Sequence, residues 1–329
     1  MMNDKLKRLG INLPPLPVTS VGSFPKPGYL TKARAEFSRR KIGRSELEKF
    51  EKQATDEWLD YQKRAKVDIF VDGEMYRGDM VAFFAEIMPG FDRGGLVRSY
   101  GNRFYHKPII VDEVSWPHPM TVDWWKYSQG RSSSPVKGML TGPYTIMDWS
   151  FNEHYESRRE AAIALADCIR KEVAALIEAG CKIIQIDEPA ISVRTDELDT
   201  AIETMHRVTD GQEAYFITHI CYGTFEKIYP KMLEIPVDNI DLELSNSNLD
   251  MLGLFHKHPF TKDISFGVVD VHTHVIEDIQ TIKARIKQAL EYIPREQLWI
   301  DPDCGFKTRS IEETKAKLDN IMAAVQDFR

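Results

Sequence analysis

A histidine and a cysteine stand two positions apart in ITHICYG, residues 217–223, within a chain of 329 residues that has four cysteines. Because side chains alternate along a β-strand, His219 and Cys221 would face the same way. Zinc takes four nitrogen, sulfur or oxygen ligands, and a catalytic zinc keeps a position for substrate. The pair is therefore a candidate half of a metal site. The alternative is a buried strand in which cysteine is a small apolar residue.

Two further ligand-type residues follow other short apolar segments. Glu243 ends NIDLE, and Cys304 ends LWIDPDC. If these segments are parallel strands of one barrel, their carboxyl ends meet at the rim where barrel active sites lie. We therefore expect His219, Cys221, Glu243 and Cys304 to converge and to be able to hold Zn²⁺. Cys168 lies in a helical pattern and Cys181 directly follows one, so we expect both to pack in the core.

The elements that would position these residues recur along the chain. Apolar segments rich in Val, Ile and Leu are expected as strands at 17–24, 67–74, 136–143, 182–189, 214–223, 239–245, 264–274 and 298–306. Their continuous apolar cores are typical of parallel strands covered on both faces. Helical patterns lie between them, as at 157–180 and 279–293. This alternation predicts an α/β fold, specifically a (β/α)8 TIM barrel. A doubly wound open sheet is the alternative, but no GxGxxG follows the first strand.

The remaining segments are expected to decorate one domain that spans residues 1–329. Residues 1–16 are predicted to form an N-terminal arm, and residues 25–66 helices that pack on the barrel. Residues 91–135 interrupt the strand–helix rhythm and predict an insertion after the second strand, with a β-hairpin around RFYHKPIIV, that frames the site.

Composition excludes several functional classes. The net charge of −7 and pI near 5.8 argue against nucleic-acid or anionic-membrane binding. No apolar run approaches the roughly 18–20 residues that span a bilayer, and the N-terminus has no signal-peptide pattern. The four cysteines are too scattered for a disulfide framework, so we expect a cytoplasmic protein.

Eight motifs carry a family resemblance. In chain order they are VGSFPKP (21–27), VDGEMYRGDM (71–80), SYGNRF (99–104), LTGPYTIMDWSF (140–151), IQIDEPA (184–190), HICYG (219–223), VVDVH (268–272) and WIDPDCGFKTR (299–309). Together they resemble cobalamin-independent methionine synthases, over the catalytic C-terminal barrel alone. The chain is thus similar to the short, core form of that family.

The resemblance implies a role for each matched residue. His219, Cys221, Glu243 and Cys304 would be the zinc ligands, and His272 the proton donor, oriented by Asp270. Homocysteine would bind to Gly22, Ser23, Glu74 and Asp187. The two carboxylates would hold its amino group. Trp149 would stack on the pterin of methyltetrahydrofolate, and Arg103 would lie near that substrate.

Two departures from the family pattern lie on the methyl-donor side. Val193 stands where the family has a folate-contacting acid, and Phe104 where it has a cysteine. The thiol side is intact. The resemblance therefore predicts homocysteine methylation, with methyltetrahydrofolate as the donor and a methylcorrinoid or its carrier protein as the alternative.

The residue chemistry agrees with this reaction. A free thiol is mostly protonated at pH 7, and zinc binding deprotonates it. A methyl group on a tertiary amine transfers only if the nitrogen is protonated as it leaves, which a histidine such as His272 can do. Three rivals remain: a hydrolase that uses the DVHTH run (270–274) for metal, a zinc methyltransferase for another thiol such as coenzyme M, and a zinc-stabilised binding protein.

Overall fold

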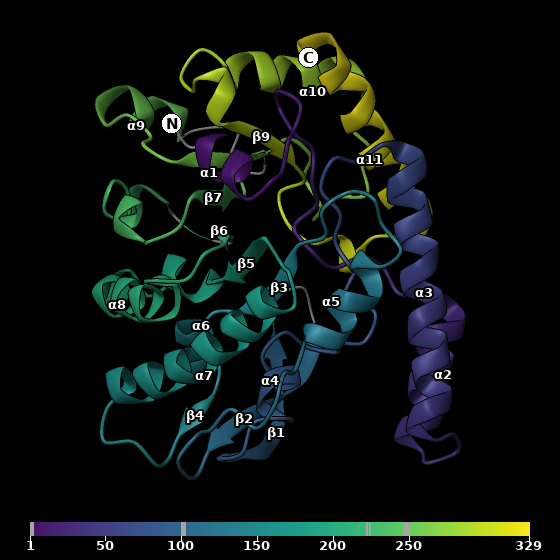
Figure 1. The fold of residues 1–329 in the computed structure, drawn as a ribbon, viewed down its shortest axis with the longest axis vertical. Helices are drawn as coiled ribbons and strands as arrows, with labels where there is room; N and C mark the ends of the chain where they lie inside the picture. The colour runs from purple at the N-terminus through teal and green to yellow at the C-terminus, as the bar shows by residue number, and fades with distance from the viewer. Residues whose placement is uncertain (1–2, 100–102, 222, 224, 246–250) are drawn as a thin grey trace. The chain divides into compact units, whose positions relative to one another are not determined.

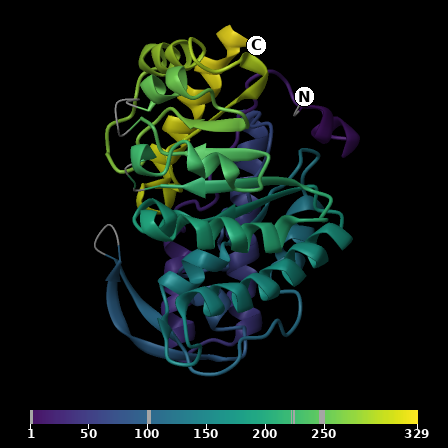
Figure 2. The same ribbon diagram turned by 90° about the vertical axis from the view of Figure 1, so that its left-hand side faces the viewer.

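The computed structural model describes residues 3–99, 103–221, 223, 225–245 and 251–329. Figure 1 and Figure 2 show the chain coloured from its N-terminus to its C-terminus. Its contacts divide it into two compact units. The first unit comprises Met1–Tyr76, Trp124–Lys137 and Asp241–Arg329, and the second comprises Arg77–Asp123 and Gly138–Ile240. The single-domain prediction for residues 1–329 stays a prediction. None of the helices in the described ranges is long and apolar enough to cross a membrane.

Parallel pairing runs through the first unit. Strand β8 (Asp263–Gly267) pairs with β9 (Leu298–Asp301), and β9 continues through a parallel bridge between Ile300 and Val18. Further parallel bridges join Ser23 to Gly73 and Phe70 to Val136. The strands expected at 17–24 and 67–74 are therefore present only as short bridged segments. The second of them ends where Gly73 and Glu74 take positive φ angles, which a continuing strand cannot do.

Helices cover the strands of this unit. They are α1 (Asn3–Arg8), α2 (Gly28–Ser38), α3 (Arg44–Ala65), α9 (Leu252–Lys257), α10 (Ile279–Ala289) and α11 (Ile311–Val325). Helices α2 and α3 pack side by side, as do α10 and α11 (Figure 1). Local sequence fixes their starts: the Asp278 carboxylate accepts a hydrogen bond from the N–H of Thr281 at α10, and Ser310 with Glu313 forms a capping box at α11.

The second unit has a parallel sheet of β3 (Gly138–Thr141), β5 (Ile183–Asp187) and β6 (Tyr215–Ile220). Every residue of these three strands is buried, as expected of strands with no solvent face. Its helices are α4 (Ala82–Ala85), α6 (Pro143–Asp148), α7 (Arg158–Glu178) and α8 (Leu198–Thr209). Strand β7 (Asn239–Leu242) contains the boundary between the units.

The segment expected as an insertion contains an antiparallel pair. Strand β1 (Phe91–Ser99) pairs with β2 (Arg103–Ile110), and β2 pairs in parallel with β4 (Phe151–Asn152). This pair confirms the antiparallel strands expected around RFYHKPIIV. Helix α5 (Val122–Gln129) follows it along the chain. Whether the segment frames the active site stays a prediction.

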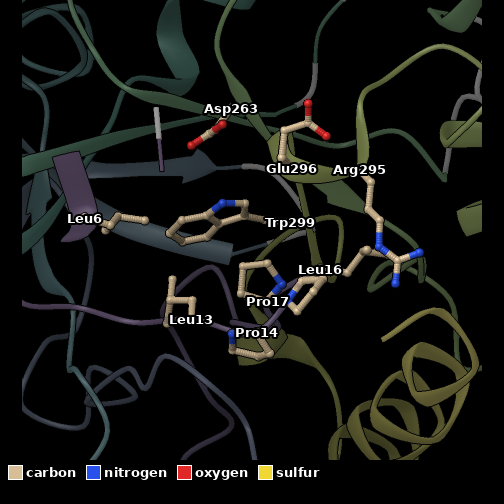
Figure 3. A pocket seen from close by; sticks show the side chains of 10 residues that line it. Leu6, Leu13, Pro14, Leu16, Pro17, Asp263, Arg295, Glu296 and Trp299 are labelled. Atoms are coloured by element: carbon tan, nitrogen blue, oxygen red, sulfur yellow. The ribbon is translucent and has the colours of Figure 1, made fainter. Parts of the chain in front are cut away.

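The N-terminal arm packs beneath β8 and β9 in the first unit. Leu6 and Leu16 are buried, and with Leu13 and two prolines they face Trp299 (Figure 3). A cavity of about 190 Å³ remains between them. Asp263 and Trp299 lie at the starts of their strands, so the arm covers the amino ends and leaves the carboxyl ends to the candidate site.

Candidate active site

In the first unit, an imidazole, a carboxylate and a thiol come together after the ends of three strands. Glu243 directly follows β7 and is buried, and its Oε1 lies 3.2 Å from Nε2 of His272. Cys304, which follows β9, is half-buried and close enough to influence His272 electrostatically. The pKa of His272 is raised, first by its hydrogen bond to Glu243 and then by the charges of Glu243, Cys304 and Asp270, against the opposing effect of burial.

Asp270 contacts the backbone of His272 rather than its ring. Its Oδ1 accepts a hydrogen bond of 2.7 Å from the backbone N–H of His272, whereas the imidazole contacts Glu243. His272 also lies on an irregular segment after β8, because that strand ends at Gly267 rather than near residue 274 as expected. Asp270 therefore shapes the backbone on which His272 lies, and Glu243 is the ring's partner.

A buried carboxylate that sequence reasoning missed links Glu243 to Cys304. Asp303 Oδ1 accepts hydrogen bonds from the backbone N–H groups of Leu244 (3.0 Å) and Ser245 (2.9 Å), and its Oδ2 accepts from the Ser245 hydroxyl. Burial raises the pKa of Asp303 to about 7. Because it immediately precedes Cys304, its side chain ties the segment after β9 to the segment after β7. The signal in the sequence was an acid inside the apolar context of WIDPDC.

The segments expected to bind homocysteine meet the Cys304 segment in the same unit. Ser23 bridges to Gly73, and its carbonyl accepts a hydrogen bond of 2.8 Å from the N–H of Phe306. A Cβ at Gly305 would lie 2.2 Å from Ser23 Oγ, so that close approach requires glycine. Glu74 is half-buried, with a φ of 58°.

That positive φ is held by the neighbours of Glu74. Asp72 Oδ1 accepts a hydrogen bond of 2.8 Å from the Glu74 N–H, and Lys26 Nζ donates to the Glu74 carbonyl at 3.1 Å. Non-glycine residues in this conformation store strain and cluster at binding sites. In the first unit, Ser23 and the Gly73–Glu74 turn thus lie next to the segment that follows Cys304.

In the second unit, His219 and Cys221 lie at the end of β6 as the alternation predicts. Both are buried, and a ring nitrogen of His219 lies within 4.8 Å of Cys221 Sγ. Their backbones are held by the segment after β5: the His219 carbonyl accepts from the N–H of Glu188 at 3.0 Å, and the Cys221 carbonyl accepts from Ser192 Oγ at 2.8 Å.

Asp187 and Trp149 lie in this unit as well. Asp187 ends β5 and has a fractional exposure of 9%. Its Oδ1 accepts a hydrogen bond of 2.7 Å from Gln185 Nε2. Trp149 caps the end of α6 and is half-buried. The buried Glu188, another residue that sequence reasoning missed, accepts three hydrogen bonds at the start of α6, from Tyr144 N–H, Thr145 N–H and Thr145 Oγ1. Burial raises its pKa to about 7 against these bonds.

The remaining donor-side residues are less informative. Arg103 begins β2, but its side chain lies outside the described part of the structure. Phe104 and Val193, the two departures from the family pattern, are 65% and 51% exposed. Neither side chain is needed by the core of its unit.

Comparison with known proteins places this geometry in a family. Residues 16–327 match the family model described as "Cobalamin-independent synthase, Catalytic domain". The chain belongs to this family. It is 36% identical to the methionine synthase of Saccharolobus solfataricus, over 96% of each chain. It is 38% identical to the 5-methyltetrahydropteroyltriglutamate–homocysteine methyltransferase of Streptococcus suis, over 99% of this chain but 45% of that enzyme. The chain therefore spans about half the length of such curated relatives.

A solved structure agrees with the assignment to the cobalamin-independent synthases. The B12-independent methionine synthase from Shewanella sp. W3-18-1, in complex with selenomethionine, matches with a TM-score of 0.86 and 29% identity over 96% of this chain and 98% of that chain. This likeness confirms the predicted α/β, (β/α)8 fold class. A methylcorrinoid donor, the alternative left open by the sequence, conflicts with a family described as cobalamin-independent.

Proposed function

We propose that this cobalamin-independent synthase transfers a methyl group from a 5-methyltetrahydropteroyl donor to the thiol of L-homocysteine, forming methionine. The observation that carries the proposal is the cluster of Glu243, His272 and Cys304 in the first unit, with Ser23 and Glu74 beside it. The names of the relatives from Saccharolobus solfataricus and Streptococcus suis support both substrates. The selenomethionine bound to the Shewanella enzyme supports a site for the product.

We propose His219, Cys221, Glu243 and Cys304 as ligands of a zinc ion. The donor set, one imidazole, two thiols and one carboxylate, fits zinc, and three of its members are buried. In the second unit, the imidazole of His219 and the thiol of Cys221 lie within 4.8 Å of each other. When bound, zinc would hold the homocysteine sulfur as a thiolate, the nucleophilic form.

The remaining residues would bind and orient the substrates. Glu74 and Asp187 would accept hydrogen bonds from the homocysteine ammonium, and the Gly22–Ser23 turn would contact its carboxylate end. Trp149 would stack on the pterin, near Arg103. Coenzyme M has no ammonium group for two carboxylates to bind, which argues against that thiol as the substrate.

His272 would donate the proton that the folate nitrogen needs as the methyl group leaves. Its side chain is about one-third exposed, so it can reach a substrate, and Glu243 fixes the ring. General acids within hydrogen-bond reach of a leaving group contribute typically about 10²–10⁴-fold. Asp270 would hold the backbone of His272 rather than its ring.

The hydrolase reading of Asp270, His272 and His274 finds no support in the geometry. Asp270 accepts from a backbone N–H, the His272 ring contacts Glu243, and the ring of His274 contacts Glu313 on α11 at 2.7 Å. The side chain of His274 is 79% exposed and lies on the surface of the first unit.

The test is methionine formation by the zinc-loaded chain. Homocysteine would be supplied with 5-methyltetrahydropteroyl monoglutamate and, separately, triglutamate, and methionine would be measured by mass spectrometry. We expect turnover with at least one of the two. A zinc-replete protein that binds homocysteine but forms no methionine from either donor would refute the proposal.

A further inference from the structure

The segment that carries His272 has little regular structure of its own. Between the end of β8 and the start of α10, residues 268–278 form neither helix nor strand. Backbone bonds anchor its beginning, where the Val268 N–H donates to the Asp301 carbonyl (2.9 Å) and the Val269 carbonyl accepts from the Asp303 N–H (3.0 Å). Beyond Val269, the backbone groups of this segment are bound by side chains, some from the segment itself, such as Asp270 and Glu277, and others from α11. Buried backbone polar groups must find such partners.

The main support is a fully buried lysine on α11. Lys317 Nζ donates to the carbonyl of Asp270 at 2.9 Å and to the carbonyl of Val275, and it lies 2.6 Å from Glu277 Oε2. The other oxygen of Glu277 accepts a hydrogen bond of 2.8 Å from the Asp270 N–H. The buried pair therefore holds the peptide groups on both sides of Asp270, two residues before His272.

One face of α11 is dedicated to this segment. Glu313, Lys317 and Asn320 recur at the i, i+4, i+7 spacing that lines up side chains along a helix. Glu313 contacts the ring of His274, and Asn320 Nδ2 donates to the Glu277 carbonyl at 2.8 Å. Three consecutive turns of the helix thus bind one irregular segment.

Folding stability alone is a weak reason for such a pair. Removing two charges from water is costly, and well-packed apolar residues at the same positions are often as stable or more stable. All three contacts of the Lys317 ammonium fall on one segment. The lysine therefore fixes the path of that segment's backbone. A proton donor needs a fixed position, because its displacement by about 1 Å can lower the reaction rate by roughly 100-fold.

We propose that Lys317 and Glu277 are positioning residues for His272, acting through the backbone of Asp270. Neither touches the reacting atoms. The proposal rests on the proposed function in one respect, since it takes His272 to be the proton donor.

Three variants test it. Lys317→Met removes the donor but keeps the length of the side chain, and it leaves the buried Glu277 carboxylate with only the more distant Arg285 guanidinium, at 3.8 Å. Lys317→Met with Glu277→Gln removes both charges together. Lys283→Met is the matched control, because Lys283 on α10 pairs with Asp327 at 2.5 Å in the same unit.

The readouts are the thermal midpoint, kcat and KM for homocysteine, and the ring signals of His272 by NMR with labelled histidine, assigned through their loss in His272→Asn. Lys317→Met should lower the midpoint by roughly 5–10 °C and kcat by about 100-fold, with KM for homocysteine nearly unchanged. The double variant should regain most of the midpoint but not kcat, because the two carbonyls still lack their donor. The His272 signals should shift in both variants and not in Lys283→Met.

Recovery of kcat together with the midpoint in the double variant would overturn the proposal, as would unshifted His272 signals. The NMR measurement needs no turnover. If the wild-type chain formed no methionine, the proposed function would fail on that assay, whereas the ring signals would still decide whether Lys317 and Glu277 position His272.

Discussion

The two units hold their candidate residues in different ways. In the second unit, Asp187 and His219 belong to β5 and β6, whose backbones pair in a parallel ladder. In the first unit, Glu243, His272 and Cys304 all lie beyond the ends of their strands, on irregular backbone. The first arrangement is set by the sheet itself. The second depends on side chains that bind the backbone from other elements.

Those side chains are few and buried. Asp303 holds the residues after Glu243, and Lys317 with Glu277 holds the residues before His272. A buried polar group is costly unless all its bonds are made, so each of these sites is sensitive to a single substitution. The difference between the units implies that changes outside the site should disturb the first unit's residues more than the second's.

The largest effect should come from removing one thiol from either unit. We expect Cys221→Ser and Cys304→Ser each to lose bound zinc and to lower methionine formation by about 10³-fold or more, because both thiols would be ligands. Metal content by plasma mass spectrometry checks this. Cys181→Ser is the control, since Cys181 is buried beside Gly138 and Ile183 and should leave zinc in place. Zinc retained in Cys304→Ser would instead favour a metal site that does not use the first unit's thiol.

Replacing His272 by asparagine should give the next largest effect. Asparagine cannot donate a proton to the leaving nitrogen, so kcat should fall by about 10²–10⁴-fold. Zinc content and homocysteine affinity, measured by calorimetry, should stay within error of wild type. His274→Asn is the matched control, because the ring of His274 contacts Glu313 at the surface. A comparable loss in both variants would contradict a proton-donor role for His272.

The second unit was the more predictable from sequence. The alternation in ITHICYG correctly placed His219 and Cys221 at the end of a buried strand, because that strand is regular and its neighbour β5 pairs with it. The apolar run before Asp187 correctly predicted a buried strand for the same reason. For a residue inside a paired strand, the alternation of the local sequence is enough to predict which way its side chain points.

The first unit was less predictable, for a physical reason. The expected strand at 264–274 ends at Gly267, where a Cβ would lie 2.1 Å from an Asp303 carboxylate oxygen. The partners that then shape the segment are far along the chain: Lys317 lies 40 residues from Glu277. No local pattern in DVHTH reveals that pairing or the contact between the ring of His272 and Glu243.

Asp303 offers a direct test of the difference between the units. Asp303→Ala should weaken zinc binding by about 10–100-fold, because the backbone after Glu243 loses the acceptor of two N–H groups and a hydroxyl. Gly267→Ala should act in the same direction by displacing that carboxylate. In the second unit, Ser192→Ala removes the hydroxyl bonded to the Cys221 carbonyl and should weaken zinc by no more than about threefold, since β6 remains paired. Competition with a zinc chelator measures the zinc affinity of all three variants. Equal losses of affinity would show that strand pairing does not protect the second unit's ligands.

The smallest expected effect is a difference in chemical reactivity among the four cysteines. It depends on how deeply each thiol is buried and on the backbone that carries it. Burial raises the pKa of Cys168 to about 11 and of Cys181 to about 12, so both should stay thiols and resist iodoacetamide at pH 8. In zinc-free protein, Cys304 should react first, because it is half-buried on an irregular segment, and Cys221 more slowly, because it is buried beyond β6. Peptide mass spectrometry gives the order, and added zinc should protect Cys221 and Cys304 together. Protection of Cys304 without Cys221 would mean that the two thiols do not share one ion, and it would contradict the proposed ligand set.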